Sequence, residues 1–351
     1  MVPMRVSLLV LSGVLLGSTG GAQSRPAPVS ALPHVSSTGQ VVVPPVALSV
    51  RGPNINESAA NSSSTLPDDA LKPEETHRKL VDLIQVIFTV TDKHGEFVKD
   101  LKQDQFKVLD NNLPPKEIVG FESQTDLPLR VGLLFDASNS IRERFLFEQQ
   151  ATEQFLRKVI RPQSDKAFVL AFDEVSEVTQ DFTNDLDKLG AGIRIIRPGG
   201  GTAVWDAVYY ACRDKMMKEE NSTPVRRAII LLSDGDDNQS RVLRQEAIEM
   251  AQRAEVIVYT ISTNLSNVHD GGDRNLQALA DATGGRAFYP YKLSDISDDL
   301  NEIQGELRSQ YSIAYKPDDF SPNGQFRSIQ ITPENTKLRV RVSKGYFAPK
   351  R

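Results

Sequence analysis

The stretch LLFDASNSI, residues 133–141, changes from apolar to polar side chains at a single acid. Asp136 ends the apolar run, and the hydroxyl side chains of Ser138 and Ser140 follow it at a spacing of two. The stretch contains no histidine, lysine or cysteine that would supply the base for nucleophilic chemistry. Three roles are therefore open for these side chains: they hold a metal ion, bind a phosphate group or begin a helix. The rest of the sequence is needed to distinguish these roles.

The stretch lies in a region, residues 128–308, where short apolar runs alternate with helical patterns. Four runs are nearly continuous: RVGLLF, AFVLAF, RAIILL and EVIVYTI. Such runs are typical of strands covered on both faces, as in parallel sheets. Apolar residues at helical spacing lie between them, in the sets Phe147, Ala151, Phe155, Val159; Leu243, Ala247, Ala251, Ala254; and Ile296, Leu300, Ile303, Leu307. The alternation predicts an α/β fold with a doubly wound, mostly parallel, Rossmann-like sheet.

Both flanks of this region are predicted to be rich in β-strands. In residues 83–123, LIQVIFTV alternates apolar and polar positions, and a turn follows at DNNLPP. In residues 309–349, QYSIAYKP, FRSIQITP and LRVRVSKGYF predict three more strands. We expect a small β-sandwich-like unit. The sequence leaves open whether the two flanks pair, with the α/β domain inserted between them.

The N-terminal region has the features of an exported chain. Residues 1–22 combine a positive charge, an apolar run of 12 residues and small residues near Ala22, which predicts a secretory signal peptide. Residues 23–79 lack Phe, Trp and Tyr and are rich in proline and serine, which predicts a disordered linker. No later run is long enough to span a membrane. We expect a protein that is secreted, or located in the periplasm or cell envelope.

The net charge and the cysteine content limit the kinds of partner and the covalent bonds that we expect for this chain. The net charge of −5 argues against nucleic-acid binding, which requires a basic patch or stripe. Cys212 is the single cysteine, so no intramolecular disulfide can form, and we expect a buried, inert thiol.

Two further loops contain side chains with oxygen atoms and are expected at the same edge of the sheet as Asp136. Asp234 follows the apolar run AIILLS, as Asp136 follows GLLF, and Thr202 lies in the glycine-rich stretch RPGGGTAVWDA. Ligands of open α/β sheets bind outside the carboxyl ends of the strands, so these loops are expected to meet. Together with Ser138 and Ser140, they offer five oxygen-bearing side chains. Hard divalent cations prefer such ligands, and compact hydroxyl ligation favours Mg²⁺ over Mn²⁺ or Ca²⁺.

DASNS, GGGTAVWDA and LLSDGDD, in this order, resemble the three loops of the von Willebrand factor type A domain. The resemblance covers about residues 128–308 and implies that family's metal-ion-dependent adhesion site (MIDAS). The β-rich flanks are similar to those of a set of exported bacterial proteins with this domain. The resemblance implies adhesion or protein binding without catalysis, in which the cation accepts a carboxylate from a protein or surface ligand.

The resemblance also implies a role for each of the five residues. Ser138 and Ser140 would bind the metal directly, and Thr202 would bind it directly or through water. Asp136 and Asp234 would act mostly through water.

Alternatives remain open. Ser138 and Ser140 are also suitable residues to begin a helix near Ile141. A metal-dependent phosphohydrolase would place an acid after a strand, but the position of its second acid is taken here by Ser138. The glycine-rich loop lacks the nucleotide-binding patterns. The protein could instead serve assembly of the cell envelope through its β-rich flanks.

Four neighbours of the predicted site are expected to have supporting roles. Asp206 is expected at the start of a helix or as a hydrogen-bond acceptor behind the site. Asp236 and Asp237 are expected as solvated loop charges, although either could orient metal-bound water. Trp205 is expected to pack behind the threonine loop, which is the glycine-rich stretch RPGGGTAVWDA, although an indole at the rim could contact a partner.

Overall fold

The computed structural model describes residues 83–124, 127–139, 145–220, 224–264 and 268–350. They belong to one compact unit, Glu75–Arg351. The predicted signal peptide, the predicted linker and Ser140 lie outside the described residues.

Six strands form a sheet in the order β6-β5-β4-β7-β8-β9. They are β4 (Leu129–Asp136), β5 (Lys166–Phe172), β6 (Ser176–Thr183), β7 (Arg226–Ser233), β8 (Val256–Ser262) and β9 (Ala287–Phe288). The edge strand β6 is antiparallel to β5, and the other neighbours are parallel. All residues of β4 are buried, which explains its continuous apolar run. The predicted mostly parallel sheet is confirmed.

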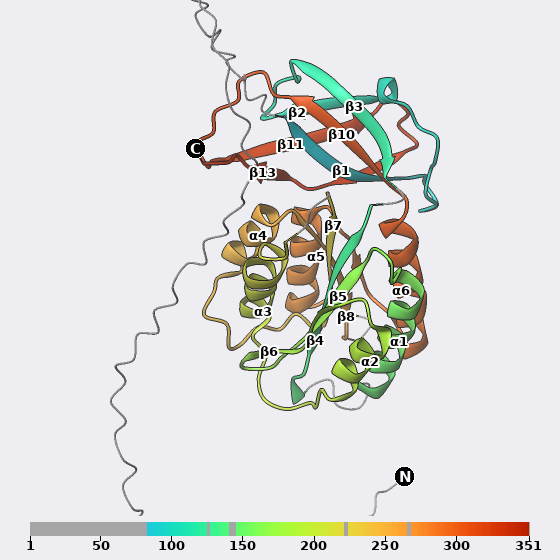
Figure 1. The fold of residues 1–351 in the computed structure, drawn as a ribbon, viewed down its shortest axis with the longest axis vertical. Helices are drawn as coiled ribbons and strands as arrows, with labels where there is room; N and C mark the ends of the chain where they lie inside the picture. Colours follow the sequence, from blue (N-terminus) through green and yellow to red (C-terminus); the bar gives the residue numbers. More distant parts are fainter. Residues whose placement is uncertain (1–82, 125–126, 140–144, 221–223, 265–267, 351) are drawn as a thin grey trace, which may run out of the picture. The chain divides into compact units, whose positions relative to one another are not determined.

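Helices cover both faces of this sheet (Figure 1). On one face lie α1 (Phe145–Val159), α2 (Leu186–Arg194) and α6 (Leu293–Leu307). On the other lie α3 (Val204–Tyr210), continued by a π-helical segment (Ala211–Met216), with α4 (Arg244–Arg253) and α5 (Gly271–Thr283). The predicted stripe on α6 is buried along its length.

One predicted core position is wrong. Leu243 is 69% exposed, whereas Ala247, Ala251 and Ala254 of the same predicted set are buried. The reason is that α4 begins at Arg244, and Leu243 precedes it in an extended conformation, so Leu243 is not part of the helical repeat that carries the buried face.

The two β-rich flanks pair with each other in two antiparallel sheets. One sheet has the order β12-β1-β10-β3, and the other has the order β13-β11-β2. The strands are β1 (Ile84–Thr91), β2 (Phe106–Asp110), β3 (Glu117–Gln124), β10 (Gln310–Lys316), β11 (Phe326–Pro333), β12 (Arg339–Val342) and β13 (Gly345–Phe347). A shared apolar core lies between them, with Phe88 and Val108 among its buried side chains. The predicted strand LRVRVSKGYF is divided at Ser343, and its halves join different sheets.

Polar contacts connect this β-rich unit to α6. The buried carboxylate of Glu306 forms an ion pair with Arg341 of β12 and accepts a hydrogen bond of 3.3 Å from Thr89 of β1. Burial raises the pKa of Glu306, and Arg341 opposes the rise.

Cys212 is buried, as expected, and burial raises the pKa of its thiol. Within the described ranges, no helix has the length and apolar character needed to cross a membrane.

Candidate functional site

Asp136 is the last residue of β4, in the middle of the six-stranded sheet. Its side chain is 1% exposed. The backbone N–H of Ser138 donates to Oδ1 at 2.9 Å, and the hydroxyl of Ser233 donates to Oδ2 at 2.6 Å. Ser233 ends β7, the parallel neighbour of β4, so two strand ends fix the orientation of this carboxylate.

Burial raises the pKa of Asp136 to about 6. Hydrogen bonds from Ser233 and Ser138 oppose this rise, whereas the negative charge of Asp234 adds to it. Asp234 directly follows β7, the parallel neighbour of β4, so both acids lie at the same edge of the sheet, as expected from the sequence. A positive charge between them would favour the ionised form of both.

The threonine loop joins the site through its backbone. The backbone N–H of Thr202 donates to Oδ1 of Asn238 at 3.0 Å, and the carbonyl oxygen of Thr202 accepts from the N–H groups of Asn238 and Gln239. The side chain of Thr202 is 4% exposed. This loop is therefore held against the segment that follows Asp234.

Gly235 permits a close approach beside Asp234. Its φ is +76°, and a Cβ atom at this position would lie 2.4 Å from the carbonyl oxygen of Gly272 in α5. A Cβ on Gly272 would lie 2.1 Å from the carbonyl oxygen of Asp234. Only glycine fits at both positions, and the pair sets how the Asp234 loop lies against α5.

Further backbone hydrogen bonds connect the loops at the carboxyl edge of the sheet. Ala137 N–H donates to the carbonyl of Phe172 at 2.7 Å, and Gly199 N–H donates to the carbonyl of Ala137 at 2.6 Å. Ala203 N–H donates to the carbonyl of Asp173 at 2.7 Å. The loops after β4 and β5 and the threonine loop are therefore held together without a contribution from the five predicted side chains.

The structure brings Asp136, Ser138 and Asp234 to one edge and holds the loop of Thr202 beside that of Asp234. Ser140 lies outside the described residues.

Sequence reasoning did not identify Ser233 or Asn238 as part of this arrangement. Ser233 was visible as the serine before Asp234 in LLSDG, but its partner depends on the register between β4 and β7. Asn238 contacts Thr202 across 36 positions, and no local pattern indicates such a contact.

Asp237 was expected to be a solvated loop charge, and the structure corrects this. Its Oδ1 accepts from Ser240 N–H at 3.2 Å, and its Oδ2 accepts from Trp205 N–H at 3.2 Å and from the Ser240 hydroxyl. Asp236 is exposed, as expected. Asp206 accepts from two backbone N–H groups, and Trp205 is 6% exposed, in line with their expected supporting roles.

The chemistry of the donor set is compatible with a hard divalent cation. The described members are two carboxylates and two hydroxyls, and such cations prefer oxygen ligands. Among the residues that the structure describes, no group of three or more His, Cys, Asp and Glu side chains is arranged to hold a metal. A metal bound here would therefore depend on the serine and threonine hydroxyls as well as on the two carboxylates. The two carboxylates would balance the charge of a divalent cation, so the occupied site would have a formal charge close to zero.

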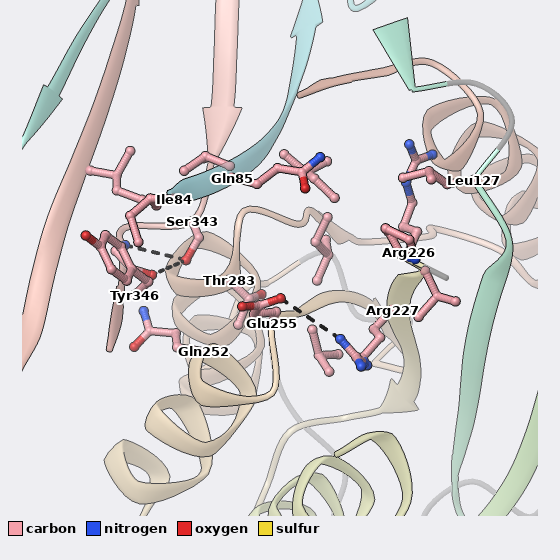
Figure 2. Close-up of a pocket in the computed structure, with 18 of the residues that line it drawn as sticks. Ile84, Gln85, Leu127, Arg226, Arg227, Gln252, Glu255, Thr283, Ser343 and Tyr346 are labelled. Carbon is pink, nitrogen blue, oxygen red and sulfur yellow. Dashed lines mark hydrogen bonds and ion pairs between the residues drawn. The ribbon is translucent and has the colours of Figure 1, made fainter. Parts of the chain in front are cut away.

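Two cavities border the sheet at opposite ends. The larger, about 740 Å³, is lined by the first residues of β7 and β8 and by strands of the β-rich unit. Figure 2 shows Glu255 and Arg227 facing each other on its wall, 4.0 Å apart. None of the five predicted residues lines it. The smaller, about 300 Å³, is bordered by Ala137, directly between Asp136 and Ser138.

Residues 131–306 match the family model of the von Willebrand factor type A domain. The match covers half of the chain, and the chain belongs to this family. The resemblance seen in DASNS, GGGTAVWDA and LLSDGDD is thereby confirmed, together with the fold it implied. Domains of this family commonly bind a divalent metal at a MIDAS and mediate protein interactions.

Several solved structures are similar at low sequence identity. A von Willebrand factor type A protein from Catenulispora acidiphila is 12% identical, covering 76% of this chain and 73% of that chain, with a TM-score of 0.46. Proximal thread matrix protein 1 from the mussel byssus is 16% identical, with a TM-score of 0.45. That alignment covers 56% of this chain and half of the mussel protein. The von Willebrand factor domain of the type V pili tip protein Mfa5 from Porphyromonas gingivalis is 15% identical, with a TM-score of 0.41. That alignment covers 51% of this chain and 94% of the Mfa5 chain. No curated protein matches this chain.

Proposed function

We propose that this protein is an exported binding module that captures an acidic group of a protein or surface ligand through a bound divalent cation. The single observation that carries the proposal is the convergence of Asp136, Ser138 and Asp234 at the carboxyl edge of the sheet. Membership of the von Willebrand factor type A family supports it.

The proposed metal residues are Asp136, Ser138, Ser140, Thr202 and Asp234, with Ser140 assigned from the sequence alone. Ser233 holds the carboxylate of Asp136 in place through its hydroxyl, and Asn238 holds the threonine loop. When bound, the cation would act as the positive charge that accepts the partner's carboxylate. Because two carboxylates and neutral hydroxyls do not overcompensate a divalent charge, an outside carboxylate remains attracted. We favour Mg²⁺, since compact hydroxyl ligation suits a small ion.

We also propose the domain arrangement and location expected from the sequence. Residues 1–22 would direct export, residues 23–79 would act as a spacer, and residues 128–308 would form the binding domain between β-rich segments 83–123 and 309–349. The mature protein would act outside the cytoplasm, without catalysis.

Thermal unfolding of the full chain with Mg²⁺ and with EDTA tests the proposal. A ligand that binds only the folded state at 100 times its Kd stabilises it by about 2.7 kcal/mol. For a domain of this size, each kcal/mol raises Tm by about 2–4 °C. We expect Mg²⁺ to raise Tm and Asp136→Ala to abolish the shift. Asp104→Ala removes an exposed acid from the β-rich unit and should leave the shift unchanged.

Equal Tm values of the wild-type chain in Mg²⁺ and in EDTA would remove the basis of the proposal. A metal-dependent phosphohydrolase would instead turn over an aryl phosphate and lose this activity in Asp136→Asn. We expect no turnover.

A further inference from the structure

One side of β1 is covered along only half of its length. On that side β12 pairs with Phe88–Thr91, and its last residue, Val342, lies opposite Phe88. On the other side β10 pairs with β1 from Ile84 onward. Among the residues that the structure describes, no strand pairs with Ile84–Ile87 on the side of β12. We call this stretch the open edge of β1.

The direction of the main-chain groups of β1 follows from its pairing near Thr91. Thr91 pairs with β12 on one side and with Phe97 on the other. On the Phe97 side, the carbonyl oxygen of Val90 accepts from the N–H of Val98 at 3.1 Å. In an antiparallel strand, successive residues direct their N–H and C=O groups to opposite sides. Even-numbered residues of β1 therefore direct these groups towards β10, and odd-numbered residues direct theirs towards the side of β12.

The open edge thus presents main-chain groups that a further strand could bind. By this alternation, the N–H and C=O of Gln85 and the N–H of Ile87 point to the side where β12 has ended. The side chain of Gln85 is exposed, and that of Ile87 is partly buried. Main-chain groups at the edge of a sheet form a template for the pairing of another extended chain.

A groove runs along the open edge. The cavity of about 740 Å³ is lined by all four residues of the open edge and by the first residues of β7 and β8. Figure 2 shows Gln85 on one wall of this space and Glu255 on another. Four residues of a strand span about 13 Å, so the open edge offers pairing for a segment of about this length.

The line of β12 indicates which side chains such a segment would carry. Val340 and Val342 of β12 pack against the apolar core of the β-rich unit. Between them, Arg341 faces the other way and forms an ion pair with Glu306 of α6. Tyr346 packs against the same core and also lines the groove. A segment that continues this line would alternate apolar side chains towards the core with polar side chains towards the ends of β7 and β8.

The charged residues that line the groove have no net charge. Glu219 and Glu255 balance Arg226 and Arg227. Arg227 and Glu255 form an ion pair of 4.0 Å, and Glu219 forms one of 2.9 Å with Lys166. A segment without net charge therefore suits this groove better than an acidic or a basic segment.

We propose that the groove binds an extended, uncharged segment of a partner protein, which pairs antiparallel to the open edge of β1 and alternates apolar with polar side chains. Main-chain hydrogen bonds provide the affinity in this mode of recognition, and the alternating side chains provide the selectivity. The interaction is separate from the proposed metal site, because none of the five predicted metal residues lines the groove.

Hydrogen exchange of the full chain, measured by NMR with and without a synthetic peptide, tests this proposal. The peptide is acetyl-Ser-Val-Thr-Ile-Thr-Val-Ser-amide, which has the expected alternation and no charge. At 90% occupancy we expect exchange of the Gln85 and Ile87 amides to slow about tenfold. The amide of Val86 faces β10 and should exchange at an unchanged rate. The result should be the same in Mg²⁺ and in EDTA.

Two N-methylated forms of the peptide are the matched controls. Residues directly opposite each other in an antiparallel pair carry their side chains on the same face, so the polar residues of the peptide lie opposite Gln85 and Ile87. Methylation of the two threonine nitrogens removes donors that face β1 and should weaken binding about tenfold. Methylation of the isoleucine nitrogen and one valine nitrogen should leave binding unchanged.

Gln85→Pro tests the same contact from the side of the protein. Proline is tolerated in a strand where the N–H points out of the sheet, so the variant should fold and should bind the unmodified peptide more weakly. If the variant does not fold, the two methylated peptides still decide the outcome with the wild-type chain.

Three results would overturn the proposal. The first is an equal effect of the two methylated peptides, because main-chain pairing would then not be the basis of binding. The second is slow exchange at Gln85 and Ile87 without any peptide, because the edge would then be covered by the chain itself or by a second copy. The third is a lack of any slowing by the unmodified peptide, or slowing that EDTA abolishes. A missing response of Tm to Mg²⁺ would bear on the proposed function alone.

Discussion

The hydroxyl oxygen of Ser233 lies 2.6 Å from Oδ2 of Asp136, although 97 positions separate the two residues. Both stand at the ends of central strands, and the parallel register of β4 and β7 brings them together. The hydrogen bond orients a buried carboxylate towards the edge where Ser138 and Asp234 also lie. The ends of two neighbouring strands therefore fix the orientation of the Asp136 carboxylate.

Ser233→Ala removes this contact and is expected to lower the free energy of unfolding. Hydrogen bonds to charged groups contribute about 1.5–3 kcal/mol, and the carboxylate stays buried without its donor. Urea denaturation in EDTA at pH 7 measures the change. We also expect a weaker response of Tm to Mg²⁺, because the orientation of Asp136 is less restricted.

Thr152→Val serves as the comparison for removal of a buried hydroxyl. The Thr152 oxygen in α1 is buried and has no hydrogen-bond partner among the described residues. Valine keeps the shape and removes the unsatisfied oxygen, so stability should be unchanged or higher. A loss in Thr152→Val as large as in Ser233→Ala would contradict the assignment of a specific Ser233–Asp136 bond.

Gly235→Ala is expected to destabilise the protein and to impair the Mg²⁺ response. The alanine Cβ would lie 2.4 Å from the carbonyl oxygen of Gly272, and the positive φ adds a strain of about 1–3 kcal/mol. Gly95→Ala provides the control, because Gly95 also has a positive φ but an alanine methyl group there would have no atom within 4 Å. Calorimetry of both variants with and without Mg²⁺ separates backbone strain from the steric contact. Similar losses in the two variants would show that the close approach to α5 is unimportant.

Asp110→Ala is expected to destabilise the β-rich unit strongly. The buried carboxylate of Asp110 accepts from Arg327 at 2.8 Å and from the hydroxyls of Tyr315 and Tyr346 at 2.9 Å each. Removing one member of a buried ion pair costs about 3–5 kcal/mol when the other charge is left unpaired. We expect the lower end of this range, because Arg327 keeps a second ion pair of 2.6 Å with Asp319. The double variant Asp110→Leu/Arg327→Met should recover much of this loss in urea denaturation. No recovery would mean that the hydroxyl contacts, and not the ion pair, dominate.

The pH dependence of stability should contain a contribution from Asp299 on α6. Burial, and next the charge of Glu302, raise the pKa of Asp299 to about 7, from 3.8 in the unfolded chain, and Arg286 opposes the rise. Between these values the folded state keeps a proton that the unfolded state has lost. The contribution to stability is therefore complete below about pH 4 and is lost as pH rises through 7.

Asp299→Asn tests this contribution by urea denaturation from pH 4 to 8. The difference in unfolding free energy between the variant and the wild type should grow across this range in favour of asparagine and level off above pH 7. A difference that is constant with pH would show that Asp299 titrates as it does in the unfolded chain.

Much of the fold follows from local sequence patterns. The runs GLLF and AIILL predicted buried parallel strands because both faces of β4 and β7 are covered by helices. The exposed position of Leu243 could not be predicted, because apolar spacing does not locate the first residue of α4. The division of LRVRVSKGYF at Ser343 depends on which sheet each half joins, and this is a tertiary effect.

The two acids of the candidate site could be predicted from the sequence, but the residues that orient the site could not. Asp136 and Asp234 each follow an apolar run, so a topological rule was enough to expect them at one edge. The partners that orient the site, Ser233 and Asn238, depend on strand register and on a contact across 36 positions. Asp237 looked solvated because its sequence neighbours are polar, whereas its partners come from the folded threonine loop and Ser240.

We propose that the oxygens of Asp136, Ser138, Ser140, Thr202 and Asp234 enclose one divalent cation. A crystal structure of the full chain grown with Mn²⁺ tests this proposal, because the anomalous signal locates the metal. We expect one strong peak about 2.0–2.3 Å from the hydroxyl oxygens of Ser138 and Ser140. Diffraction data with no peak at this edge of the sheet, or with manganese bound elsewhere only, would contradict it.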